Sequence, residues 1–153
     1  MNKKAQPTLA AVFALSVMVG STIANSPASE LATIRLTTAP QNAGKIAQAT
    51  LVSVGDATQI ALFVSGVPSN VAQPPNLYTY IYPGACGRLG PKPAFAMNQR
   101  VLIDYPTYHS IQLRKMVPIK LGELRAGDYA LVVRTSPADG AVDIFCGSLK
   151  QAT

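Results

Sequence analysis

Turn residues occur at short intervals along this chain of 153 residues. In the segments between them, apolar and polar residues alternate with a period of two. From Leu31 onward, Ala32, Ile34 and Leu36 alternate with Thr33, Arg35 and Thr37. This alternation is typical of a half-buried β-strand. No long stretch shows the 3.6-residue period of an amphipathic helix. The pattern therefore excludes a helical bundle and predicts an all-β protein.

Turn signals divide the rest of the chain into segments of strand length, with connections such as Gly55-Asp56-Ala57 and Pro83-Gly84. We expect about eight strands, which is the number typical of a β-sandwich or barrel. A single helical turn is expected near 122–126. The expected strands are 31–37, 45–54, 58–65, 77–82, 100–105, 111–121, 128–135 and 142–149.

Residues 1–24 have the three parts of a secretory signal peptide. Lys3 and Lys4 form the basic start, an apolar run covers 9–19, and small residues end at Ala24. A transmembrane helix needs about 20 apolar residues, and this run is roughly half as long. We therefore expect cleavage near Ala24, a periplasmic or secreted protein, and no stable membrane insertion afterwards. Residues 25–30 are expected to form a flexible tail, and 31–153 the β domain.

The chain has two cysteines, Cys86 and Cys146. An exported protein meets an oxidising compartment, where such a pair is expected to form a disulfide. The alternative is that the cysteines are metal thiolates, but the sequence shows no further ligands close to them.

Charge and histidine content exclude several kinds of protein. Only 13% of the residues are charged, and the 13 basic and 7 acidic residues give a net charge of +6. The basic residues are scattered, so they predict a weakly positive surface and not a nucleic-acid-binding stripe. The single His rules out a histidine-rich metal centre, and a Ser-His-Asp site would need His109 as its base.

Two spaced cysteine motifs carry a family resemblance. The first is Leu-Tyr-Thr-Tyr-Ile-Tyr-Pro-Gly-Ala-Cys-Gly-Arg-Leu-Gly-Pro over 77–91, and the second is the run 125–139 followed by Asp-Ile-Phe-Cys-Gly over 143–147. They resemble the copper,zinc superoxide dismutase-like family, in which His-x-His precedes Gly-x-Cys and Ala-Cys-Gly lies near the end. The resemblance implies a Greek-key β-sandwich or flattened barrel. It also implies that the disulfide ties the loop after the first motif strand to the last strand.

The same resemblance gives the positions at which the family binds copper. They read Tyr80, Tyr82, Lys92 and Arg134 here, and none of them has an imidazole. Neutral phenols are poor copper ligands, and cationic side chains repel a metal ion. The histidines of the family's zinc loop are also missing between Pro91 and Asp104, and Asp143 stands where the enzymes have an arginine that attracts superoxide. The expectation is a retained fold with no metal, no cofactor and no catalysis.

Tyr78, Tyr80 and Tyr82 share one face of an expected strand. Together with Lys92 and Arg134, they form our candidate binding surface for an anionic small molecule or an acidic protein partner. The alternative is that the tyrosines pack against the loop 84–93. The predicted function is that of an exported, non-catalytic binding or interaction protein, whose ligand the sequence does not name.

A second class of function stays open. The protein could be a divergent copper,zinc superoxide dismutase or a copper-handling protein with non-standard ligands. Met97, Met116 and His109 are the side chains that could bind Cu(I). Tyr105 and Tyr108 lie next to His109 in sequence and form a second aromatic cluster, expected at a loop tip.

Overall fold

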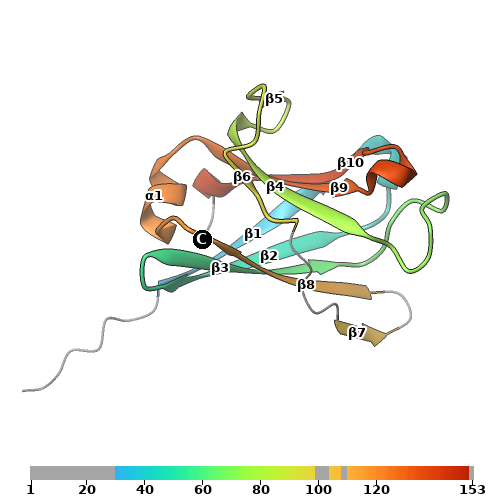
Figure 1. The fold of residues 1–153 in the computed structure, drawn as a ribbon, viewed down its shortest axis with the longest axis horizontal. Coiled ribbons are helices and arrows are strands. Elements are labelled where there is room, and N and C mark those ends of the chain that lie inside the picture. The colour runs from blue at the N-terminus through green and yellow to red at the C-terminus, as the bar shows by residue number, and fades with distance from the viewer. Residues whose placement is uncertain (1–29, 99–103, 108–109, 152–153) are drawn as a thin grey trace, which may run out of the picture.

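The structure is a computed structural model that describes residues 30–98, 104–107 and 110–151. Its antiparallel strands form two layers (Figure 1). The first layer contains β1 (Leu31–Thr38), β2 (Ala47–Val54), β3 (Ala57–Val64) and β8 (Ser110–Val117), and the second contains β4 (Leu77–Ala85), β9 (Tyr129–Thr135) and β10 (Asp143–Ser148). The short strands β5 (Arg88–Leu89), β6 (Phe95–Ala96) and β7 (Asp104–Thr107) lie at the margins.

The strand order makes this fold a Greek key. Neighbouring strands follow the order β5-β4-β9-β10-β1-β2-β3-β8-β7, and β6 pairs with β4. The chain crosses from the first layer to the second between β3 and β4 and returns before β8, so β3 pairs with β8 and β4 pairs with β9, neither of which is its neighbour in sequence. β1 joins the two layers, because its residues 31–36 pair with β2 while Thr37 and Thr38 pair with β10. The predicted all-β class and flattened-barrel architecture are confirmed.

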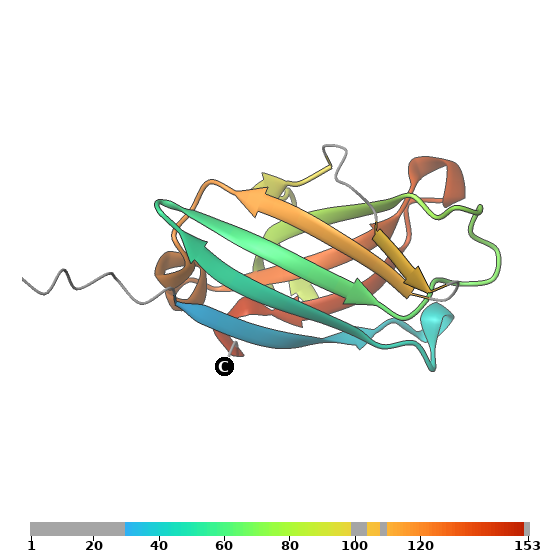
Figure 2. The same cartoon turned by 90° about the horizontal axis from the view of Figure 1, so that it is seen from below.

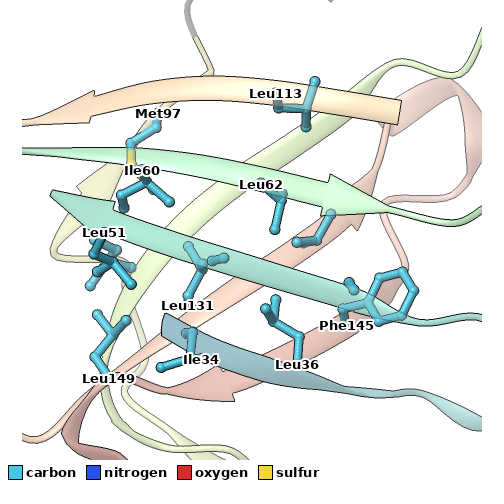
Figure 3. Close-up of a cluster of buried hydrophobic side chains, with 14 of the residues drawn as sticks. Ile34, Leu36, Leu51, Ile60, Leu62, Met97, Leu113, Leu131, Phe145 and Leu149 are labelled. Carbon is cyan, nitrogen blue, oxygen red and sulfur yellow. The ribbon is translucent and has the colours of Figure 1, made fainter. Parts of the chain in front are cut away.

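The core lies between the two layers (Figure 3). Alternate residues of each strand point inward, as in β8, where buried and exposed residues alternate along its length. Leu51, Leu131 and Phe145 come from both layers and are each at most 1% exposed. Burying a side chain of this size contributes about 1.5–3 kcal/mol. The layers are therefore held together by apolar packing that neither could form alone.

Several predicted boundaries differ from those observed. The predicted strand 111–121 ends at Val117, where Pro118 lacks the N–H that would continue the ladder. Helix α1 (Leu121–Ala126) follows, close to the predicted turn, and buries Leu121 and Leu124. Of the predicted strand 100–105, only the residues from Asp104 onward are described, and they belong to β7.

The described part of the chain begins at Glu30, the last residue of the predicted flexible tail. Its carboxylate lies 2.7 Å from Nη1 of Arg125, and its carbonyl oxygen accepts a hydrogen bond from the Ser53 N–H. Glu30 is therefore attached to the domain. The predicted signal peptide and residues 25–29 lie outside the described residues. Within the described ranges, no helix has the length and apolar character needed to cross a membrane.

Candidate functional site

The candidate site lies on the second layer, on the face turned away from the core. Thr79 and Ile81 of β4 point inward and are almost fully buried, so Tyr78, Tyr80 and Tyr82 point outward. The β4–β9 register sets Tyr78 opposite Arg134. Because directly opposed residues of antiparallel strands share a face, the tyrosines and Arg134 lie on the same side of the sheet.

Arg134 contacts two of the three tyrosines. Its Cζ lies 5.2 Å from the ring centroid of Tyr80 and 5.9 Å from that of Tyr82. The two ring centroids are 6.0 Å apart, and the ring planes are tilted by 55°. A guanidinium at this range from an aromatic face is attracted by the ring quadrupole, with about 0.5–1 kcal/mol for an exposed pair. These contacts therefore join a side chain of β9 to two side chains of β4.

Asp143 completes the group, which we call the Tyr-Arg cluster: Tyr80, Tyr82, Arg134 and Asp143. Nε of Arg134 donates a hydrogen bond of 2.5 Å to Oδ1 of Asp143 on the neighbouring strand β10. This hydrogen bond is the main cause that raises the pKa of Arg134, so the guanidinium stays charged. Since the carboxylate offsets that charge, the cluster is close to neutral and not strongly cationic.

The structure brings together only part of the predicted surface. Tyr80, Tyr82 and Arg134 meet, and Tyr78 is half-buried beside them. Lys92 is exposed in the connection between β5 and β6, and no ion pair to it is found in the described part of the chain. The pairing of Asp143 with Arg134 was not predicted from the sequence. The signal that could have predicted this pairing is the opposite charge of Arg134 and Asp143, which lie on the two strands of the hairpin around 137–140.

The predicted disulfide between Cys86 and Cys146 is confirmed, with a Cα–Cα distance of 5.9 Å. Cys146 lies opposite Val132 on the outward face of the second layer. The bond therefore holds the chain after β4 against this face. Tyr82 is only 8% exposed and Val132 is fully buried, although both point away from the core. One end of the tyrosine row is thus covered, which favours packing for Tyr82, while Tyr78 and Tyr80 keep partial exposure.

The structure does not form the Cu(I) site that the sequence suggested from two methionines. Met97 belongs to the core cluster, whereas Met116 is 52% exposed on the outer face of β8. Their side chains point to opposite sides of the first layer, so they cannot share one ion. Among the described residues, no three His, Cys, Asp or Glu side chains lie close enough to hold a metal. His109 and Tyr108 lie outside the described residues, and Tyr105 falls in β7.

Comparisons with protein-family models, with curated proteins and with solved structures gave no match for this chain. The superoxide dismutase-like family therefore stays a resemblance that rests on the residues quoted from the sequence.

Proposed function

We propose that this protein is an exported, non-catalytic binding domain of the copper,zinc superoxide dismutase-like type. It binds an anionic small molecule or an acidic protein surface at the Tyr-Arg cluster. The observation that carries this proposal is the guanidinium of Arg134, which lies against two tyrosine rings at positions where the resemblance places metal ligands. Tyrosine and arginine are also the residues most enriched at recognition surfaces.

Two further features support the proposal. The disulfide connects the segment after β4 to the last strand, as the resemblance implies. A stable disulfide is also compatible with an oxidising, extracytoplasmic compartment, either the periplasm or the outside of the cell. Phenol and guanidinium groups replace imidazoles at the family's copper positions, which favours binding over redox chemistry.

The geometry also limits how a ligand binds. Because Nε of Arg134 donates to Asp143, a ligand oxygen has only the terminal guanidinium nitrogens to bind. The ligand's negative charge would then lie near the Asp143 carboxylate, and like charges repel. Asp143 therefore weakens anion binding at this site, and its removal should strengthen it.

Citrate titration followed by NMR tests the site. We expect citrate to shift the backbone signals of β4, β9 and β10. The Arg134→Ala variant should bind citrate more weakly than the wild type, and the Asp143→Asn variant should bind it more strongly. Asp56→Asn is the matched control, because Asp56 is 92% exposed and pairs with Lys120 elsewhere. If Tyr80→Ala and Arg134→Ala unfold the protein and leave residual binding unchanged, the cluster is a packing feature and the proposal is wrong.

Elemental analysis tests the non-catalytic part of the proposal. Mature protein purified without a histidine tag should contain no stoichiometric copper or zinc and should not dismutate superoxide. Stoichiometric copper together with activity above that of the free metal would instead establish the alternative, a divergent dismutase or copper-handling protein.

A further inference from the structure

The outer face of the first layer exposes several large apolar side chains to solvent. The registers align Leu31, Val52, Gln59 and Met116 in one row across β1, β2, β3 and β8. Leu31 and Met116 are 58% and 52% exposed. Figure 2 shows these four strands in front of the second layer, with no other described element crossing them. The face is therefore a broad surface with apolar side chains in contact with solvent.

The charge on this face has one sign. Arg35 and Arg114 are exposed on it, and the four strands contain neither Asp nor Glu. Phe63, which is 37% exposed, lies in the same row as Arg35, and Ala61 pairs with Arg114. The nearest acidic residue in the register is Asp104 of β7, opposite Gln112 at the margin. Arginine, methionine and phenylalanine are the residue types enriched in protein interfaces.

We propose that this outer face docks an acidic surface of a partner protein. The positive charge requires a partner of opposite sign, and the exposed Leu31, Phe63 and Met116 supply the apolar contact. A second copy of the chain would set arginines against arginines across a symmetric interface, which disfavours self-association. Thr33, Thr50 and the glutamines of the face offer directional hydrogen bonds, which suit a protein surface better than lipid chains.

The size of the face limits the affinity that we expect for the partner. Four strands of eight residues cover roughly 19 Å by 26 Å, which is below the area of about 800 Å² per partner in a standard interface. The complex is therefore expected to be transient and sensitive to salt, because exposed arginines contribute through electrostatic attraction. This face belongs to the opposite layer from the Tyr-Arg cluster, so the proposal stands independently of the proposed function.

The test uses a soluble helical peptide that presents leucine on one face with glutamate on either side. NMR of the mature protein should show shifts in β1, β2, β3 and β8, and binding should weaken about tenfold or more in the double variant Arg35→Glu, Arg114→Glu. The double variant Arg88→Glu, Lys150→Glu is the matched control, since it makes the same change in net charge on exposed residues outside these strands. A peptide with lysine in place of glutamate should not bind.

Other outcomes would overturn the proposal. Equal loss of binding in both double variants would show that only net charge matters. Shifts confined to β4, β9 and β10 would place the peptide on the Tyr-Arg cluster instead. Binding to phosphatidylglycerol vesicles without binding to the peptide would identify a membrane surface as the partner. A dimer in sedimentation velocity that Met116→Glu dissociates would identify a second copy.

Discussion

Asp139 is a single residue that joins two loops. Its Oδ1 accepts a hydrogen bond of 3.0 Å from the Ala72 N–H, and its Oδ2 accepts one of 2.6 Å from Oγ of Ser136. The hydrogen bond from Ser136 first, and that from Ala72 second, lower the pKa of Asp139 below its ordinary value of 3.8. A carboxyl with a lowered pKa stabilises the fold above its ordinary pKa, and this stability is lost as the pH falls through the folded value.

We therefore expect the Asp139→Asn variant to have a lower melting temperature than the wild type at pH 7. The difference between the two melting temperatures should become smaller as the pH falls below 3.8. Thermal melts followed by circular dichroism between pH 7 and pH 2 measure this. Asp56→Asn serves as the control, because that carboxylate is exposed. A difference that stays constant over the whole pH range would contradict the assignment of the effect to ionisation.

Gly84, which lies near the end of β4 and pairs with Leu89 of β5, shows how one residue fixes a backbone path. Its φ is +94°, and a Cβ there would run into the carbonyl oxygen of Arg88. Gly87 has a similar φ of +90°, but a Cβ there would meet no atom within 4 Å. Gly87→Ala should cost about 1–2 kcal/mol for the left-handed conformation. Gly84→Ala should cost about 1–3 kcal/mol more because of the clash. Urea unfolding of both variants gives the comparison, and equal losses would contradict it.

At the scale of elements, the disulfide is the covalent link between the end of β4 and β10. It closes a loop with a sequence separation of 60 residues. Limiting the unfolded chain in this way contributes about 4 kcal/mol in the chain-entropy model. The double variant Cys86→Ala, Cys146→Ala should lose about this much in urea unfolding. Mass spectrometry of unreduced wild-type digests provides the control. Two free thiols in freshly isolated protein would contradict the link.

The hairpin of β9 and β10 explains how the Tyr-Arg cluster is assembled. The register shifts between Asp143 and Phe145, so the strand carries a β-bulge. Ile144 and Phe145 are both buried, while Asp143 stays opposite Arg134 on the outer face. With strict alternation, Asp143 would point to the side opposite Cys146. The bulge redirects the carboxylate toward the guanidinium, as bulges commonly do at functional positions.

At the scale of the whole molecule, one core joins the two layers. Phe145 is 1% exposed inside it, whereas Phe63 is 37% exposed on the outer face of β3. Phe145→Ala should cost about 3–5 kcal/mol, because it removes buried area and leaves a cavity. Phe63→Ala, the same chemical change on the surface, should cost less than about 1 kcal/mol. Urea unfolding measures both, and similar losses would mean that the core is not organised as described.

Sequence patterns were enough to predict the β class, the positions of most strands, the short helix near 122–126 and the pairing of Cys86 with Cys146. These follow from local information: the period of two, the turn residues and the presence of only two cysteines. Local patterns place residues on the inner or outer face of a strand as long as alternation is strict.

Which side chains contact one another depends on how the strands pair and pack. The pairing of Arg134 with Asp143 depends on a bulge that breaks the alternation. The separation of Met97 from Met116 depends on the pairing of β6 with β4, because the segment that follows β6 places Met97 in the core. Register and layer packing are set by contacts between residues far apart in the chain, and one slip of register turns every side chain to the other face. The chemistry of both candidate surfaces is therefore a property of the assembled sheet.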